Sequence, residues 1–171
     1  MKRLCLLNNK LTKTIISIFL FQIMSCSSID GEVSKLVSSM TLEEKIGQMT
    51  QVDYRYLADK SDIKKYFLGS ILSGGGSTPP TNQPSSWVEL YNGFQQEALK
   101  TRLKIPLIYG IDAVHGHNNV LGATMFPHNI GLGCMDDKAL VQEIAAATAA
   151  EVKATGLDWT FAPCVAVAQD E

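Results

Sequence analysis

The sequence predicts an α/β fold in which parallel strands alternate with helices. Three short apolar segments lie near residues 69–72, 107–111 and 159–162, and the stretches between them carry apolar residues at helical spacing. Near-continuous apolar strands connected by helices are typical of a parallel sheet. The strands begin roughly 40–50 residues apart, whereas a closed eight-stranded barrel needs about 250 residues. We therefore expect a partial (β/α)8 TIM-like barrel that holds only the first three or so βα units.

An incomplete barrel would leave the edge of an apolar strand unpaired, which intact proteins avoid. The expectation that follows is a fragment or a truncated gene product.

Val33, Leu36, Val37 and Met40 recur at helical spacing and predict a first helix. The next predicted helix begins with a capping box. Thr41 and Glu44 match this pattern, in which a hydroxyl accepts a hydrogen bond from the third amide and a carboxylate reaches back to the first. Leu42, Ile46 and Met49 recur at helical spacing, so we expect them to form the buried stripe of this helix.

Two longer helices are expected downstream. Ser86 and Glu89 form a second capping pattern, and an aromatic stripe that indicates core packing follows: Trp87, Tyr91, Phe94 and Ala98. The next helix should begin near Asp137, whose charge suits a helix amino end, and should end before Gly156. Its buried face is expected to hold Leu140, Val141, Ile144, Thr148 and Val152.

The charge distribution argues against a nucleic-acid-binding protein. The first 25 residues hold four basic residues and no acidic one, and the rest of the chain holds 11 basic against 17 acidic residues, a net charge of −6. Phosphate binding needs clustered Lys and Arg. The four cysteines form no CxxC pair, which argues against a structural zinc site. We expect Cys134 and Cys164 to be buried free thiols, although their spacing leaves open whether they pair.

The amino terminus has the pattern of an export signal. A basic segment precedes an apolar run from Thr14 to Met24, which is too short to remain as a membrane-spanning helix. We expect residues 1–25 to be a signal peptide, residues 26–31 a polar tether, and residues 32–171 the barrel fragment. The sequence Ile-Met-Ser-Cys resembles a bacterial lipobox, so Cys26 is the predicted lipidation site, with simple secretion as the alternative. The expected location is periplasmic or on the outer surface, on a membrane if Cys26 is acylated.

The stretch 105–133 holds the best candidates for a functional site. Asp112 follows an apolar strand, and the loop after it contains all three histidines, His115, His117 and His128. In a parallel barrel the loops at the carboxyl ends of the strands share one cavity. Residues 74–76 are three consecutive glycines that end the preceding strand. No Gly-Lys-Ser/Thr follows, so we expect a sharp turn or a close approach to a ligand instead of a phosphate loop.

Two long motifs resemble the amino-terminal barrel domain of glycoside hydrolase family 3. They are IYGIDAVHGHNNVLGATMFPHNIGLG and, after the helix EIAAATAAEVKATG, the segment LDWTFAPCVAVAQDE. The resemblance extends over most of residues 32–171 and is closest to the β-glucosidases and β-glucan exohydrolases. It implies an exo-acting enzyme that removes the terminal non-reducing β-D-glucose of a β-glucoside or β-glucan oligosaccharide with retention, without a cofactor.

The resemblance also assigns roles to residues. Asp112 matches the family's sugar-binding aspartate in the Gly-Ile-Asp motif, and a carboxylate can accept hydrogen bonds from two adjacent hydroxyls. The nucleophile and the acid/base of the family come from a later strand and typically from the second domain, so we expect no catalytic residue in these 171 residues. The family motif Arg-Trp-Gly-Arg would follow Glu171. The isolated chain is therefore expected to be inactive.

Two alternatives remain at this stage. His115 and His117 resemble the His-x-His pair that holds zinc in metal-dependent amidohydrolases, although loop bracing through ring hydrogen bonds is favoured and no metal site is expected. The other alternative is a non-catalytic glycan-binding or remnant lipoprotein. Asp158, Asp170 and Glu171 match no motif for a nucleophile or acid and are expected to be structural or solvated.

Overall fold

A computed structural model describes residues 29–164, and these belong to two compact units divided between Lys45 and Ile46. In the first unit residues 29–39 are helical, so residues 29–31 of the predicted tether belong to a helix. The signal peptide and Cys26 lie outside the described residues. Within the part that is described, no helix combines the length and the hydrophobicity needed to cross a bilayer.

The predicted capping box opens helix α2 (Leu42–Gln48). The amide of Thr41 donates to Glu44 Oε2 at 2.9 Å, and the amide of Glu44 donates to Thr41 Oγ1 at 3.2 Å. This confirms the predicted start of the helix.

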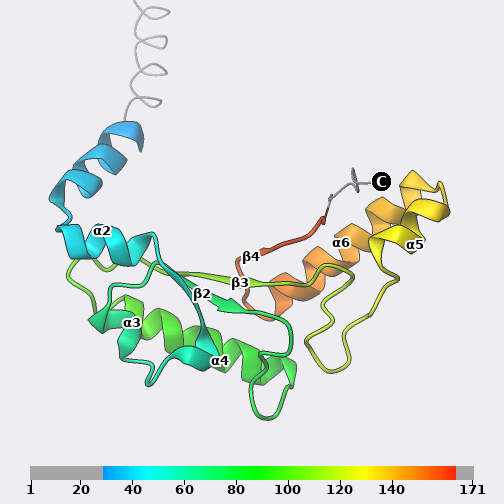
Figure 1. Ribbon diagram of the computed structural model, residues 1–171, viewed down its shortest axis with the longest axis horizontal. Helices are drawn as coiled ribbons and strands as arrows, with labels where there is room; N and C mark the ends of the chain where they lie inside the picture. The colour runs from blue at the N-terminus through cyan, green and yellow to red at the C-terminus, as the bar shows by residue number, and fades with distance from the viewer. Residues whose placement is uncertain (1–28, 165–171) are drawn as a thin grey trace, which may run out of the picture. The chain divides into compact units, whose positions relative to one another are not determined.

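The second unit is built on a sheet of four parallel strands (Figure 1), β1 (Gln51–Asp53), β2 (Ser70–Ser73), β3 (Ile108–Ile111) and β4 (Trp159–Thr160). The strands pair in chain order, β1-β2-β3-β4, as successive strands of a barrel do. The α/β class and the parallel sheet are confirmed. The segment near residues 69–72, expected to be the first strand, is the second, because β1 was missed.

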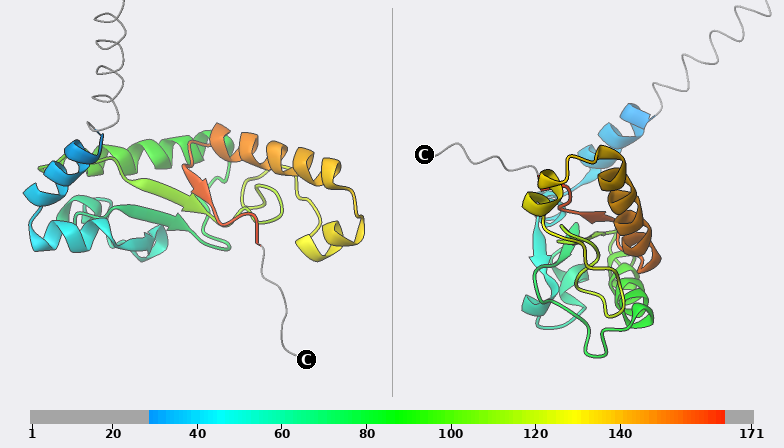
Figure 2. Two further views of the ribbon diagram at one scale, coloured as in Figure 1. Left: turned by 90° about the horizontal axis from the view of Figure 1, so that it is seen from above. Right: turned by 90° about the vertical axis from the view of Figure 1, so that its right-hand side faces the viewer.

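Helices connect the strands. Between β1 and β2 lie the 3-10 turn η1 (Tyr54–Tyr56) and α3 (Asp62–Lys65), and α4 (Pro84–Ala98) connects β2 with β3 and runs alongside the sheet (Figure 2). The short α5 (Asn129–Cys134) and the long α6 (Lys138–Ala154) precede β4. Helix α4 starts at Pro84, earlier than the predicted Ser86 cap. Helix α6 starts as predicted, because the Asp137 side chain accepts from the amide of Leu140, and Gly156 follows its end with a φ of +85°.

The core lies between the sheet and helices α3 and α4. Alternate side chains of the strands, among them Ile71, Tyr109 and Ile111, point into this core and are fully buried. They meet Trp87 and Phe94 of the predicted aromatic stripe, and the rings of Phe94 and Tyr109 contact edge to face with centroids 5.4 Å apart. Burial of such large side chains contributes roughly 1.5–3 kcal/mol each, so this layer fixes the positions of β2 and β3.

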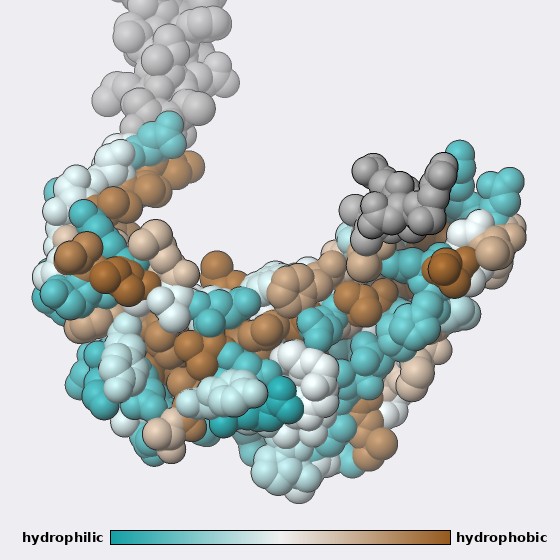
Figure 3. All heavy atoms as spheres, viewed as in Figure 1, coloured by the Kyte–Doolittle hydropathy of each residue, from teal (hydrophilic) through white to brown (hydrophobic). Residues whose placement is uncertain are grey.

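One predicted stripe is exposed, and another is buried only in part. Leu42 and Ile46 of α2, and Met49 directly after its end, are between 53% and 81% exposed. Gly47 of α2 instead lies against the segment just before β2, and its carbonyl accepts from the amide of Gly69. Of the predicted α6 stripe only Thr148 and Val152 are buried, and Figure 3 shows hydrophobic residues on the surface of the α5–α6 segment beside polar ones. Cys134 and Cys164 are free, as expected, but exposed.

Candidate functional site

Two aspartates and a glycine turn lie together at the carboxyl edge of the sheet in the second unit. Asp53 is the last residue of β1, residues 74–77 form a glycine turn directly after β2, and Asp112 directly follows β3. The register pairs Asp53 with Leu72 and Ser73 with Ile111, so these strands end at one common edge. Functional groups of parallel barrels lie at this edge.

Asp112 is held by its backbone, while its carboxylate has no hydrogen-bond partner in the described part of the chain. Its carbonyl oxygen accepts a hydrogen bond of 2.9 Å from the Thr160 hydroxyl at the end of β4. The next residue, Ala113, has a φ of +26°, a conformation that side-chain-bearing residues rarely adopt. No residue between 29 and 164 donates a hydrogen bond to the half-buried carboxylate. Its oxygens are therefore available as acceptors for a ligand.

The glycine turn lies opposite this carboxylate. A Cβ atom placed on Gly75 would lie 3.8 Å from Asp112 Oδ2. The turn thus passes directly beside the carboxylate, and Gly75 places no side-chain atom there. Gly76 needs the conformational freedom of glycine for a different reason, because its φ is +82°.

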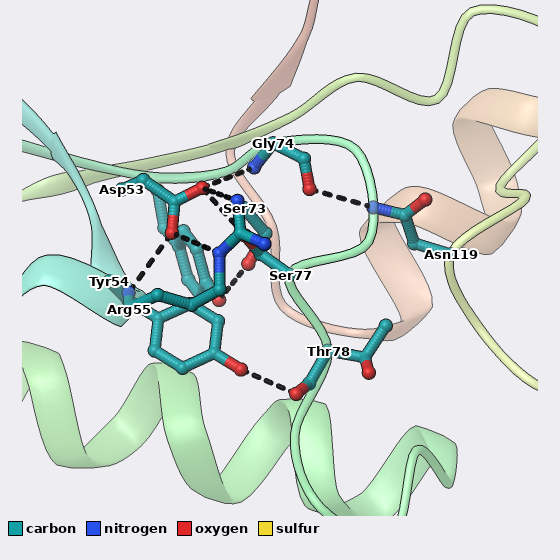
Figure 4. A network of polar contacts seen from close by, with 9 residues as sticks. Asp53, Tyr54, Arg55, Ser73, Gly74, Ser77, Thr78 and Asn119 are labelled. Atoms are coloured by element: carbon teal, nitrogen blue, oxygen red, sulfur yellow. Dashed lines mark hydrogen bonds and ion pairs between the residues drawn. The ribbon is translucent and has the colours of Figure 1, made fainter.

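Asp53 organises the turn (Figure 4). Its Oδ2 accepts from the Gly74 amide at 3.2 Å and from the Ser77 hydroxyl at 2.6 Å, and the carboxylate also binds Arg55 through the backbone amide and the guanidinium group. The Tyr54 hydroxyl donates to the carbonyl of Thr78, just beyond the turn. The hydrogen bonds of Asp53 with the turn and of Tyr54 with Thr78 connect the end of β1 to the loop after β2.

The electrostatics of Asp53 agree with this geometry. Partial burial acts to raise its pKa, but the hydrogen bonds from Arg55, Ser77 and Gly74 outweigh burial and lower the pKa below its ordinary value. Asp53 is therefore an ionised acceptor at neutral pH. Asp53 was not among the residues predicted from the sequence, where its only signal is one acidic residue after the single apolar residue Val52.

The loop after Asp112 is folded on itself. His115 donates through Nδ1 to the Phe126 carbonyl at 3.0 Å, its own carbonyl accepts from the Phe126 amide, and its ring lies against that of His128 with centroids 4.1 Å apart. Gly116 lies so close to Thr124 that a Cβ atom would be 2.1 Å from the Thr124 carbonyl oxygen. These contacts confirm the predicted bracing role of His115.

His117 is buried on the other side of this loop. Its Nε2 lies 2.8 Å from the Thr155 hydroxyl, which itself donates to the Val152 carbonyl, so Nε2 carries the proton. Its Nδ1 is buried and has no partner among the described residues. Burial lowers the pKa of His117, against a smaller opposing effect of Glu151. The ring joins the loop to the end of α6.

The two histidines of the His-x-His motif therefore bind different parts of the chain. Within residues 29–164, no group of three or more His, Cys, Asp or Glu side chains is arranged to hold a metal ion. Asp158 is structural, as expected: it accepts from the Tyr109 amide at 2.8 Å and from the Tyr91 hydroxyl, at the start of β4. Asp170 and Glu171 lie outside the described residues.

Comparison with known proteins identifies the relatives of this chain. Residues 41–171 match the family model described as Glycosyl hydrolase family 3 N terminal domain. The chain is 37% identical to the lysosomal beta glucosidase of Dictyostelium discoideum, over 82% of this chain and 19% of that protein. It is 31% identical to the periplasmic beta-glucosidase of Salmonella typhimurium, over 82% of this chain and 17% of that protein.

A solved structure shows the same architecture. The exo-1,3/1,4-beta-glucanase from a Pseudoalteromonas species aligns with a TM-score of 0.76 and 42% identity, over 84% of this chain and 18% of that one. The chain thus spans about a fifth of the length of these relatives. The partial (β/α)8-like barrel is confirmed, and the amidohydrolase interpretation of His115 and His117 is not supported. This chain belongs to glycosyl hydrolase family 3, and residues 41–171 correspond to part of the N-terminal domain of that family.

Proposed function

We propose that this chain supplies part of the glucose-binding wall of an exo-acting, retaining β-glucosidase that acts on β-glucosides or β-glucan oligosaccharides. Asp112 accepts hydrogen bonds from hydroxyls of the terminal non-reducing β-D-glucose. The supporting observation is the Asp112 carboxylate itself, which lies at the carboxyl edge of the sheet, beside Gly75 of the glycine turn, and without a donor from residues 29–164.

The chemistry of a carboxylate suits this role. An ionised carboxylate only accepts hydrogen bonds, has two oxygens, and forms charge-assisted bonds that are roughly twice as strong as neutral ones. Two adjacent sugar hydroxyls can therefore bind to one aspartate. The bonds would strengthen catalysis to the extent that they are stronger in the transition state than in the ground state.

Bond cleavage needs further groups. Retention requires two carboxyl groups about 5–5.5 Å apart, one as nucleophile and one as acid and then base. We propose that both lie outside these 171 residues, so the chain alone binds glucose weakly and cleaves nothing. Release of p-nitrophenol from p-nitrophenyl β-D-glucoside by the purified chain would contradict this part of the proposal.

Export is the second part of the proposal. Residues 1–25 direct the chain out of the cytoplasm, and an acylated Cys26 holds it at a membrane surface. Relatives named as periplasmic support export, while the membrane anchor rests on the lipobox pattern alone.

A chimera tests the role of Asp112. Residues 41–164 replace the matching segment of the Pseudoalteromonas exo-glucanase, which then supplies the rest of the enzyme. In this background we expect Asp112→Ala to lower kcat/KM by about 10³-fold, because two hydrogen bonds to a charged group contribute about 2 kcal/mol each. Glu89→Ala, which changes an exposed carboxylate on α4, serves as the control and should leave kcat/KM unchanged. Activity of the Asp112→Ala chimera within threefold of its parent would refute the assignment.

A further inference from the structure

We infer that Asp53 is a positioning residue for the sugar site: it holds the glycine turn, residues 74–77, as the wall that faces Asp112. The inference rests on the proposed function of Asp112 and extends it to a residue that never touches the sugar.

Hydrogen-bond donors surround the carboxylate of Asp53. The side chain is only 12% exposed. Oδ1 accepts from the amide and Nε of Arg55 at 3.0 and 3.1 Å, and Oδ2 accepts from Gly74, Ser77 and Nη2 of Arg55 at 2.6–3.2 Å. Both oxygens therefore already accept hydrogen bonds from the protein, and few acceptor positions remain for a ligand.

The hydrogen bonds from Gly74 and Ser77 to Asp53 hold both ends of the glycine turn. Gly74 and Ser77 are its first and last residues, and the amide of Ser77 also donates to the Gly74 carbonyl at 2.8 Å. Ser77 is fully buried. Asn119, from the loop after Asp112, lies with Nδ2 3.5 Å from the Gly74 carbonyl oxygen (Figure 4). Asp53 is thus the main acceptor that closes the turn against β1.

The glycine turn lies beside Asp112. Gly75, in the middle of the turn, is the residue whose missing Cβ would lie 3.8 Å from Asp112 Oδ2. A hydroxyl bound to a carboxylate needs an oxygen-to-oxygen distance of about 2.5–2.7 Å. A shift of the turn by about 1 Å is enough to misplace a bound group at a site of this kind. Releasing the turn should therefore weaken sugar binding without any change at Asp112.

Replacement of Asp53 by Asn is a sharp test. An amide has one acceptor oxygen and one NH2 donor, whereas all the groups around Asp53 donate. In the variant, the side-chain oxygen can accept from Arg55 or from the turn, but not from both as the two carboxylate oxygens do. The group on the other side then faces the NH2 donor of the asparagine. Asp53→Asn keeps the size of the side chain, so the expected change is in hydrogen bonding and not in packing.

Asp62→Asn is the matched control. Asp62 accepts from the amides of Ala58 and Asp59 at 3.0 and 3.3 Å and so also closes a loop through its carboxylate. That loop leads into α3, at a distance in sequence from the glycine turn. Ser77→Ala is a second test variant, because it removes the 2.6 Å bond to Asp53 and leaves the carboxylate in place.

The experiment compares these variants in the full 171-residue chain. Amide hydrogen exchange at residues 74–77 reports the order of the turn, titration with methyl β-D-glucoside followed by NMR gives Kd, and denaturant unfolding gives stability. We expect Asp53→Asn and Ser77→Ala to speed exchange at the turn and to raise Kd by about tenfold and about threefold. Asp62→Asn should change neither, even where its stability falls as far as that of Asp53→Asn.

A Kd for Asp53→Asn equal to that of Asp62→Asn overturns the inference, as does unchanged exchange at the turn. Failure of the proposed function has a different signature, since Asp112→Ala would then bind methyl β-D-glucoside as tightly as the parent. The exchange measurement needs no sugar and decides the bracing of the turn in either case.

Discussion

At the scale of single residues, two aspartates at the carboxyl ends of β1 and β3 have opposite environments. The carboxylate of Asp53 is surrounded by donors from Arg55, Gly74 and Ser77, whereas that of Asp112 has no donor from residues 29–164. Hydrogen-bonded carboxylates maintain structure, and an unpaired one at the rim of a barrel is available for substrate. Residue type alone does not distinguish these roles, but the neighbouring donors do.

The sequence predicted Asp112 and not Asp53 for a physical reason. Asp112 follows an apolar strand that is visible as a run, and its motif resembles that of a family. Strand β1 has only Val52 between Gln51 and Asp53, too few residues to show a period of two. Its partners in the glycine turn, Gly74 and Ser77, are 21 and 24 residues away, so its role at the turn follows from tertiary contacts.

His117 leads to a prediction about pH. Burial lowers the pKa of His117 below the ordinary value of 6.5, so between the two pKa values the unfolded chain binds more protons than the folded chain. The contribution of His117 to stability is therefore complete above about pH 6.5 and is lost as pH falls toward the folded pKa. We expect the free energy of unfolding, from denaturant titrations at pH 7.5, 6.5 and 5.5, to decrease with falling pH.

The control for this prediction is His117→Gln, which retains a side-chain donor for Thr155 but cannot gain a proton. Its free energy of unfolding should depend less steeply on pH over the same range. An equally steep dependence in the variant would assign the effect to other groups.

At the scale of elements, the pairing of β3 with β4 depends on a glycine. Gly110 pairs in register with Trp159, and a Cβ atom on Gly110 would lie 2.3 Å from Trp159 Cε2. Gly110→Ala must push the indole ring aside or separate the strands. Because overpacking typically costs 1–3 kcal/mol, we expect a decrease of about 2 kcal/mol in the free energy of unfolding, measured by denaturant titration.

Gly133→Ala is the matched control for Gly110→Ala. Gly133 lies in α5, and a Cβ atom there would have no neighbour within 4 Å. Alanine in a helix is more favourable than glycine by about 1 kcal/mol, so this variant should be neutral or slightly more stable. Equal destabilisation by both substitutions would rule out the contact with Trp159 as the cause.

The helices show where periodicity is sufficient and where it is not. Capping signals located α2 and α6, because a cap is a local interaction between residues three apart. The predicted stripe of α2 was wrong about burial, since Ile46 and Met49 are exposed and Gly47 makes the close approach, to the backbone of Tyr66 and Phe67. Apolar spacing shows that a helix has an apolar face, but not which element covers it.

At the scale of the whole molecule, the fold class followed from the alternation of apolar strands and helical segments. The sequential strand order also agrees with a barrel. The division after Lys45 was not predicted, because no change in composition marks it. The predicted signal peptide and the start of the tether remain predictions, since residues 1–28 lie outside the described part, whereas residues 29–31 of the tether are helical.

The predicted anchor is a property of the whole molecule and can be tested in a bacterial host. We expect the chain to incorporate labelled palmitate and to sediment with membranes, because two or more acyl chains give stable anchoring. Cys26→Ala should abolish the label and release the chain into the soluble fraction. Cys134→Ala, which changes an exposed thiol elsewhere, should retain both properties. Labelling that persists in Cys26→Ala would exclude lipidation at this residue.

The position of Trp159 over Gly110 also gives the chain an optical reporter. Its only other tryptophan, Trp87, is fully buried and hydrogen-bonded to Asn82. In a Trp87→Phe variant all indole fluorescence comes from the partly exposed ring that lies across β3. Emission from that single ring then reports, in real time, whether β4 is docked on β3 or has come away.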